Sequence, residues 1–320
     1  MRILYINERP EVHDRYLLGK IPSHWFYGAV EMEKDGHDVI WCGENSALLN
    51  DLSLVIKNKP QIIFLPNLNI RNHFLLLLLR SIGIVKIPIY AYIHHTPKAD
   101  GRFRMLYKLL INSLQHVFFL SEKTMEETVN GGFIGENNCS VPGWGADMDF
   151  YSKIPVRNGD YFISTGKENR DFDILIEAFK NVDFRLKIIT AKSHAGRNHC
   201  DLVEKCKGIP NIELRLIDNS SSFYPELLKE MASSKGLVCP LLRDKLSYCV
   251  GLSTIADAEG LHKPLIITDN PYHSKDRMGK FNVVHDVEDW IDSMKNLKHP
   301  VSDQYSMHEA YMKMKMIMKL

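Results

Sequence analysis

The chain has 320 residues, of which 45% are hydrophobic and 25% are charged. These are the proportions of a globular protein, and the length predicts two domains rather than one core. With 40 basic and 39 acidic residues the formal net charge is +1, so the overall charge does not indicate a nucleic-acid partner.

The six cysteines do not form a metal or redox motif, because no pair has the C-x-x-C spacing of such sites. His194, His199, Cys200 and Cys206 are close in sequence but lack standard ligand spacing, which favours ordinary surface residues over a metal site. We expect reduced thiols in a cytoplasmic protein. The opening MRILYINERP lacks the apolar segment of a signal peptide and predicts a first buried strand.

Short apolar runs alternate with helical patterns in the first half. The expected strands are 2–6, 38–42, 61–65, 88–93 and 116–120. Helices are expected between Ser23 and Gly36, over 52–57, 74–82 and 103–113, and after a Ser121 N-cap. The apolar run 74–79 is interrupted by Arg80 and is too short to span a membrane. This alternation predicts right-handed crossovers and a parallel sheet.

The segment 142–157 breaks this rhythm with prolines and glycines, and we interpret it as a linker. The alternation then restarts. Strands are expected at 161–164, 185–190, 212–217, 235–239 and 264–268, and helices at 172–179, 201–206, 224–232 and 254–261, before two polar helices. Two α/β halves of this kind predict a ligand cleft at the carboxyl ends of their strands.

The strongest candidate for a binding site starts at Gly251. Glycine lets the backbone approach a ligand, and Ser253 or Thr254 is placed to cap the next helix, whose free N–H groups suit a diphosphate. Asp257 falls about one turn further on, where a carboxylate can accept two ribose hydroxyls. A capped helix with one solvated acid is an equally good interpretation of the spacing.

Two more segments follow expected strands. Gly166, Lys167 and Arg170 come directly after one strand, and the two cations could clamp a diphosphate and stabilise the leaving group. The alternative is a pair of surface cations, although the dipole of the following helix disfavours them. His94 and His95 end another strand, where an imidazole can bond a sugar hydroxyl or polarise a reacting group; a structural role is equally compatible.

In order and spacing these segments resemble the retaining GT-B glycosyltransferases that build bacterial polysaccharides and glycolipids (glycosyltransferase group 1, or family 4). The resemblance covers nearly the whole chain. It rests on the opening strand and on segments 24–29, 34–39, 95–96, 118–122, 141–147, 166–171, 237–241 and 254–264.

The resemblance implies an α/β protein of two facing Rossmann-like domains with parallel sheets and an inter-domain cleft. Residues 1–154 would bind the acceptor and residues 155–300 the nucleotide-sugar donor. Residues 301–320 would form a helix that packs back on the N-terminal domain.

The resemblance also implies roles for the candidate residues. Lys167 and Arg170 match the cations that hold the donor diphosphate, and Asp257 matches the acid that holds the ribose, although glutamate is usual there. His95 is our first choice, and His94 the second, for the histidine near the reacting carbon. The remaining donor-binding candidates are Gly166, Gly251, Ser253 and Thr254.

The implied reaction is hexosyl transfer from a nucleotide sugar to a saccharide or lipid-linked saccharide. UDP is the favoured nucleotide and GDP the second choice. No metal or other cofactor is expected, and no nucleic acid. The basic and partly apolar segment 102–109 could contact the inner membrane surface, although a buried amphipathic helix is favoured.

One departure from the family pattern concerns the donor sugar. The family usually has two glutamates eight residues apart, but counting back from Asp257 leads to Cys249, and Asp244 is the nearest upstream acid. This leaves open whether transfer is retaining or inverting. It also leaves open a nucleotide-sugar epimerase of the same fold and a catalytically silent binding subunit. A dinucleotide-dependent oxidoreductase is disfavoured because no G-x-G-x-x-G follows a strand.

Overall fold

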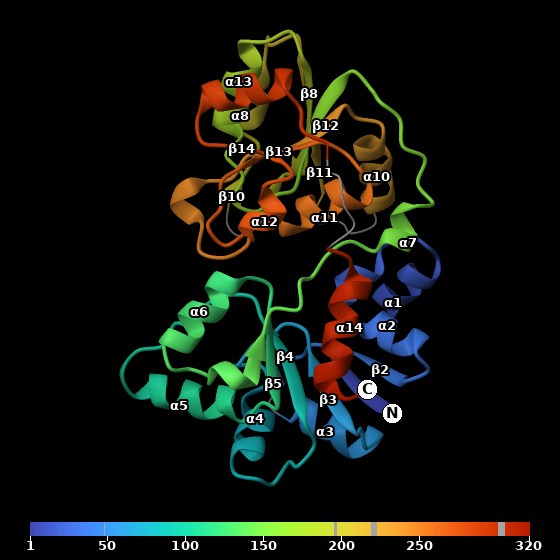
Figure 1. Cartoon of the computed structure of the whole chain (residues 1–320), viewed down its shortest axis with the longest axis vertical. Coiled ribbons are helices and arrows are strands. Elements are labelled where there is room, and N and C mark those ends of the chain that lie inside the picture. The colour runs from blue at the N-terminus through green and yellow to red at the C-terminus, as the bar shows by residue number, and fades with distance from the viewer. Residues whose placement is uncertain (48, 195–196, 219–222, 300–304) are drawn as a thin grey trace. The chain divides into compact units, whose positions relative to one another are not determined.

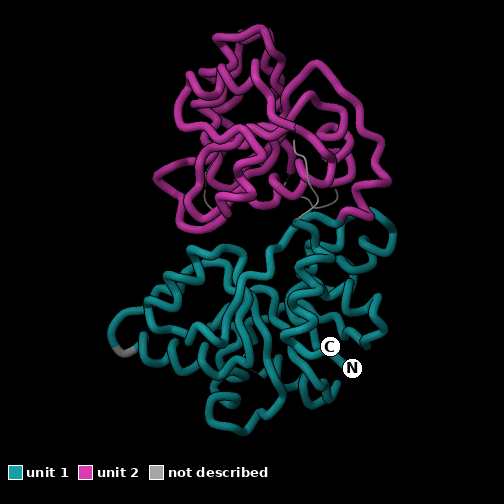
Figure 2. Tube along the Cα trace, viewed as in Figure 1, with its two compact units in different colours: residues 1–147, 305–320 teal, residues 148–304 magenta. Residues whose placement is uncertain are grey.

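The computed structural model describes residues 1–47, 49–194, 197–218, 223–299 and 305–320 (Figure 1). The chain divides into two compact units. Unit 1 contains residues 1–147 and 305–320, and unit 2 contains residues 148–304 (Figure 2). Of the expected domain boundaries, the one at 300/301 lies outside the described residues. No helix in the described part of the chain is long and apolar enough to cross a bilayer.

Unit 1 is built on a six-stranded sheet in the order β2-β1-β3-β4-β5-β6, in which each neighbouring pair is parallel. The strands are β1 (Arg2–Asn7), β2 (Asp38–Gly43), β3 (Ile62–Leu65), β4 (Ile89–Ile93), β5 (His116–Phe119) and β6 (Cys139–Ser140). The helices are α1 (Pro10–Leu17), α2 (Ala29–Lys34), α3 (Asn50–Asn58), α4 (Phe74–Ser81), α5 (Gly101–Asn112), α6 (Glu122–Asn130) and α14 (Met307–Met318).

Unit 2 repeats this plan with the strand order β11-β8-β7-β12-β13-β14, again with parallel neighbours. Its strands are β7 (Tyr161–Thr165), β8 (Arg185–Ala191), β11 (Ile212–Ile217), β12 (Gly236–Cys239), β13 (Leu265–Thr268) and β14 (Asn282–Val284), besides the small antiparallel pair β9 (Ser193–His194) and β10 (Arg197–Asn198). The helices are α7 (Met148–Tyr151), α8 (Phe172–Lys180), α9 (Leu202–Cys206), α10 (Tyr224–Ala232), α11 (Leu252–Gly260), α12 (Lys275–Met278) and α13 (Val287–Lys295).

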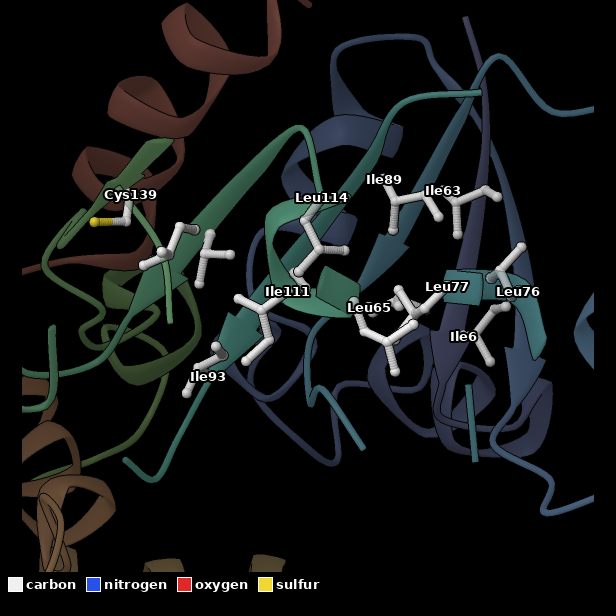
Figure 3. Packing of buried hydrophobic residues seen from close by; sticks show 14 of the residues in the cluster. Ile6, Ile63, Leu65, Leu76, Leu77, Ile89, Ile93, Ile111, Leu114 and Cys139 are labelled. Atoms are coloured by element: carbon white, nitrogen blue, oxygen red, sulfur yellow. The ribbon is translucent and has the colours of Figure 1, made fainter. Parts of the chain in front are cut away.

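The central strands are buried along their whole length, which explains why they read as continuous apolar runs. All four residues of β3 and all five of β4 are buried. In Figure 3, Leu65 of β3 lies in the same apolar cluster as Leu76 and Leu77 of α4 and Ile111 of α5. In unit 2 the corresponding cluster includes the fully buried Trp290 of α13. Helices that cover the sheet in this way leave the strand ends to carry function.

The prediction of one helix between Ser23 and Gly36 is wrong, because the structure has two separate helices there. A 3-10 helix spans Ser23–Phe26, and α2 begins only at Ala29. Between them Tyr27 and Gly28 adopt positive φ angles of 53° and 95°. Ser23 is not an N-cap: its hydroxyl donates to Glu31 and its N–H donates to Asp147 at 2.7 Å. These tertiary contacts outweigh the local helical pattern.

Helix α14 packs within unit 1. The Tyr92 hydroxyl of β4 lies 3.2 Å from the Met314 sulfur, and Tyr311 donates to Asp35 at 2.6 Å. A short parallel bridge joins Ala146 to Ser306, just before the helix begins. The chain therefore leaves unit 1 and returns to it at adjacent positions.

Candidate functional site

The loop after β7 is held in one conformation by its neighbours. Gly166 has a φ of +98°, and a Cβ there would come within 2.5 Å of the Arg170 guanidinium, so only glycine fits. The Thr190 hydroxyl donates to the Gly166 carbonyl at 2.8 Å, and Asn169 accepts the Leu242 N–H at 2.9 Å. This rigid loop is the segment in which sequence analysis places the diphosphate.

Arg170 joins this loop to the start of α11. It is 7% exposed and donates to the carbonyls of Thr165 and Glu168 and, at 3.3 Å, to the Thr254 hydroxyl. The structure thus brings Thr254 to Gly166 and Arg170, although Thr254 is 84 residues after Arg170 in the sequence. Because a guanidinium has five N–H donors, these bonds leave part of its donor capacity for a ligand.

Helix α11 begins differently from the expectation. Its N-cap is Gly251, with a φ of +94° and no side-chain cap bond, so the prediction that Ser253 or Thr254 caps the helix is wrong. The Thr254 hydroxyl instead accepts from Arg170, and Ser253 is exposed. A left-handed glycine turns the chain into the helix without a side-chain cap, and the first-turn N–H groups then have no intrahelical carbonyl partners.

Asp257 is more deeply buried than we expect for a side chain that binds a ribose. It is 8% exposed, and its Oδ1 accepts hydrogen bonds from Tyr151 at 2.6 Å and from Tyr224 at 2.8 Å. The two hydroxyls are 3.0 Å apart. Burial raises the pKa of Asp257 to about 6, and the two tyrosine hydrogen bonds oppose that rise.

The tyrosine pair was missed by sequence analysis. Tyr151 falls in the expected linker and Tyr224 at the first residue of α10, and neither position belongs to a local motif. Tyr151 packs so closely on α11 that a Cβ at Gly260 would come within 2.2 Å of its ring. The sequence signal of this packing is Gly260 alone, which does not identify Tyr151 as its neighbour.

The loop before α11 does not supply the missing acid. Cys249 is buried, and burial raises the pKa of its thiol to about 12, so it stays protonated. Asp244 is exposed and lies 3.6 Å from the Lys245 ammonium. Asn270 fixes the loop by donating to the carbonyls of Tyr248 and Val250.

Lys167 belongs to a group of mixed charge at the ends of β7 and β8. Burial and, second, the Lys167 charge lower the pKa of His194, which places the two side chains near each other. His194 Nε2 is 4.0 Å from the Glu168 carboxylate. Burial and then the neighbouring Glu168 carboxylate raise the pKa of Tyr248. A phosphate binding at Lys167 would therefore meet a nearby carboxylate as well as a cation.

The two candidate histidines of unit 1 have different surroundings. His94 Nε2 lies 2.9 Å from the Pro66 carbonyl, and burial lowers its pKa to about 4, so the neutral ring donates this hydrogen bond. His95 is exposed. The next residue, Thr96, donates to Glu127 at 2.5 Å. The structure thus separates one inward-facing imidazole from one that solvent can reach.

A third histidine near the same sheet edge was not singled out from the sequence. His73, fully buried before α4, lies 2.7 Å from Asp51 and 3.8 Å from Glu44, which directly follows β2. Glu44 also accepts from Asn72 at 2.7 Å. Within the described residues no group of three or more His, Cys, Asp or Glu side chains is placed to hold a metal ion.

The two six-stranded parallel sheets with their interleaved helices are the two Rossmann-like domains of the GT-B fold. The chain resembles glycosyltransferases of this fold. Over 100% of both chains it matches the lipopolysaccharide outer core galactosyltransferase WaaB with a TM-score of 0.64 at 10% identity. It matches OtsA with a TM-score of 0.60 at 10% identity, over 100% of this chain and 95% of OtsA.

An enzyme of a different activity has the same fold. The UDP-GlcNAc 2-epimerase from Neisseria meningitidis, solved with UDP-GlcNAc, gives a TM-score of 0.56 at 12% identity over 100% of both chains. No family model and no curated protein matches the sequence. At these identities the likeness establishes the fold, and the activity has to be argued from the site.

Proposed function

We propose that the chain is a glycosyltransferase that moves a sugar from a nucleotide-sugar donor bound by unit 2. The observation that carries the proposal is the convergence of Gly166, Arg170 and Thr254 at the start of α11. Gly166 and Gly251 both have positive φ angles; Gly166 lies against the Arg170 guanidinium, and Gly251 begins the helix. A helix N-terminus beside a fixed guanidinium is a favourable place for a diphosphate.

The donor would bind with its diphosphate at the start of α11, between the first-turn N–H groups and the side chains of Lys167 and Arg170. These groups would stabilise the charge that develops on the leaving diphosphate, so the reaction would need no metal. Asp257, about one and a half turns further along the helix, would serve the ribose. UDP is the favoured nucleotide, because two of the similar structures contain UDP or UDP-GlcNAc, and GDP is the second choice.

The acceptor would be a saccharide or a glycolipid bound by unit 1. His95 is the favoured catalytic contact because it is exposed, whereas the His94 ring is committed to the Pro66 carbonyl. Hexosyl transfer fits the galactosyl and glucosyl activities named for two of the structural relatives. One of them was solved with DNA, so an acceptor screen should include duplex DNA beside lipid-linked saccharides.

Retention of configuration is the part of the proposal with the least support from the side chains. The usual glutamate position is the buried Cys249 thiol, and Asp244 is paired with Lys245. The anomeric configuration of the product, followed by proton NMR from the first minutes of turnover, decides between retention and inversion.

Contact with an anionic membrane surface is proposed for α5. Its Phe103, Met105 and Leu109 side chains are 56%, 69% and 49% exposed, and Arg104 is exposed beside them. Apolar and cationic side chains on one exposed helix suit a headgroup layer. Sedimentation with vesicles containing phosphatidylglycerol, compared with phosphatidylcholine vesicles, should show selective binding that a Met105→Ser, Leu109→Ser variant loses.

The same purified protein tests two alternative functions, a nucleotide-sugar epimerase and a silent binding subunit. An epimerase would convert UDP-GlcNAc to a different free nucleotide sugar without an acceptor, whereas a transferase would release UDP and extend the acceptor. The epimerase relative with bound UDP-GlcNAc makes this comparison necessary. A silent subunit would bind nucleotide and turn over none of several donors.

A thermal-shift screen of the intact chain against UDP, GDP, ADP and their sugars is the first experiment. A nucleotide that binds the folded state should raise the melting temperature in proportion to the logarithm of its concentration. We expect a shift of several degrees with a nucleoside diphosphate and none with the free nucleoside. No shift with any diphosphate at millimolar concentration would contradict the proposal.

A further inference from the structure

One of the two tyrosines that bond Asp257 is more exposed than the carboxylate itself. Asp257 is 8% exposed and Tyr151 is 1% exposed, whereas Tyr224 is half-buried. Tyr224 still reaches Oδ1 of Asp257 at 2.8 Å. Of these three residues, Tyr224 is therefore the most exposed to solvent.

We propose that Tyr224, with its hydroxyl held by Asp257, makes the contact with the 2′,3′-diol of the nucleotide ribose. The proposal rests on the function proposed above and identifies the group that recognises the pentose. The Tyr224 hydroxyl donates its proton to Asp257, so its oxygen is oriented to accept a hydrogen bond from a ribose hydroxyl. A carboxylate behind the phenol strengthens it as an acceptor, because neighbouring hydrogen bonds polarise one another.

The short side chain of Asp257 explains why a second side chain, Tyr224, is needed to reach the ribose. Aspartate is one methylene shorter than the glutamate of the resembled family, and Asp257 is buried in unit 2. Asp257 is six residues after Gly251, which is about 9 Å along a helix axis. A nucleotide whose phosphates lie at the helix start would have to extend its ribose along this direction to reach Asp257. The phenol at 224 restores the reach that the shorter acid lacks.

The surroundings of Asp257 are suited to a neutral, hydroxyl-rich ligand. Both side chains bonded to its Oδ1 are uncharged phenols. Two residues further along α11, Glu259 is instead bonded by the Arg277 guanidinium at 3.0 and 2.5 Å. The same helix thus carries Glu259, which is neutralised by a cation, and Asp257, which is bonded to hydroxyls. The hydroxyls of a ribose would add to the second set of contacts.

Tyr151 is a positioning residue in this arrangement. Its ring packs on Gly260 and its hydroxyl fixes the same carboxylate oxygen, so it orients Asp257 from the buried side. The start of α10 is held as well: Arg215 lies 4.6 Å over the Phe223 ring and 3.7 Å from Glu226. These contacts hold the first turn of α10, which carries Tyr224.

The test compares UDP with 2′,3′-dideoxy-UDP on the intact protein, by titration calorimetry. GDP and its dideoxy form replace them if the screen selects guanine. Wild-type protein should bind the dideoxy compound about tenfold more weakly, the size of one or two hydrogen bonds. Tyr224→Phe removes only the hydroxyl, and we expect it to bind both compounds alike, at the weaker affinity.

Two variants separate contact from structure. Tyr161→Phe is the matched control, because its hydroxyl bonds Glu230 at the far end of β7, and its UDP-to-dideoxy ratio should equal that of wild type. Tyr151→Phe should lower the melting temperature while keeping a ratio above that of Tyr224→Phe.

The outcomes distinguish this inference from the proposed function. If wild-type protein binds no nucleoside diphosphate, the proposed function fails. If it binds UDP and Tyr224→Phe keeps the wild-type ratio, the function stands and the ribose contact is overturned. A wild-type ratio near one also overturns the contact, because the diol then contributes nothing.

Discussion

The carboxyl ends of the two parallel sheets are built from different chemistry. In unit 1 the end of β4 is closed by a side chain, since the His94 ring bonds the Pro66 carbonyl. In unit 2 the ends of β7 and β12 lead into Gly166 and Gly251, whose positive φ angles expose backbone, and Arg170 is fixed between them. The unit 1 edge offers imidazoles and acids, whereas the unit 2 edge adds exposed backbone and the Arg170 guanidinium to the mixed charges around Lys167.

This difference assigns the ligands that each edge could take. Phosphate is bound by backbone N–H groups and cations, which unit 2 brings together. Sugar hydroxyls are bound by carboxylates, amides and imidazoles such as Glu44, Asn72 and His95, which lie at the edge in unit 1. The comparison therefore supports a donor role for unit 2 and an acceptor role for unit 1, and the following predictions test it.

The largest effect is expected for Arg170→Ala. It would leave the Thr165 and Glu168 carbonyls and the Thr254 hydroxyl without their donor, at a cost of about 4 kcal/mol in unfolding free energy. Nucleotide binding should be lost as well. Urea unfolding and UDP titration measure the two effects, with the exposed Arg185→Ala as control.

Arg170→Lys then separates the structural role of Arg170 from its role in binding the nucleotide. A lysine keeps the charge but cannot form three diverging bonds, so we expect most of the stability loss to remain. If Arg170→Ala lowers UDP affinity without lowering stability, the guanidinium is a ligand and the described bonds contribute little.

Asp257→Asn should change the pH dependence of stability. The pKa of the carboxyl is raised by burial from an ordinary 3.8 to about 6, so ionisation destabilises the fold as pH rises between these values. At about 1.4 kcal/mol per pKa unit the cost reaches about 3 kcal/mol above pH 6. The stability of Asp257→Asn relative to wild type should therefore rise by that amount from pH 4 to pH 8.

Glu259→Gln is the matched control on the same helix. It would leave the buried Arg277 without its carboxylate, so it should destabilise the protein at both pH values rather than follow the same curve. A flat difference between Asp257→Asn and wild type across this range would mean that Asp257 is already solvated in the folded protein.

Sequence patterns predicted most strands and helices because their causes are local. The Ser121 side chain accepts from the Thr124 N–H and caps α6, as its position before the helix indicates. Continuous apolar runs predicted buried parallel strands such as β3 and β4 for the same reason. Local rules failed at Tyr27 and Gly28, which have positive φ angles and lie against Tyr92 and the methionines of α14.

The candidate site was predicted in part, and its limits have a physical cause. The sequence singled out Gly251 for a close backbone approach and Gly166 at the end of a strand, and both have the positive φ that favours glycine. The contact between Arg170 and Thr254 and the tyrosines on Asp257 join residues 84, 106 and 33 positions apart. Only the packed structure shows that a buried carboxylate lies between two phenols.

Histidines 94 and 95 should respond oppositely to replacement by alanine. His94→Ala removes a buried ring and its bond to Pro66, and should cost about 2 kcal/mol of stability. His95→Ala should leave stability unchanged and lower the turnover of donor in the presence of acceptor. Thermal unfolding and product formation measured on both variants decide the assignment. Loss of turnover in His94→Ala with its melting temperature intact would reverse the order of the two.

The smallest effect is expected for Lys167→Ala. Lys167 is half-buried near His194, and its charge contributes to the lowered pKa of that histidine, so the variant should raise this pKa in a histidine NMR titration. UDP affinity should fall by about threefold to tenfold at low salt and by less at high salt, because a single cation is screened. Uridine affinity should not change, since uridine carries no phosphate.

Lys180→Ala is the control: it removes an exposed cation paired with Glu177 and should leave both affinities as they are. If uridine and UDP lose affinity equally in Lys167→Ala, the lysine shapes the site rather than binding the diphosphate, and the cationic edge of unit 2 then depends on Arg170.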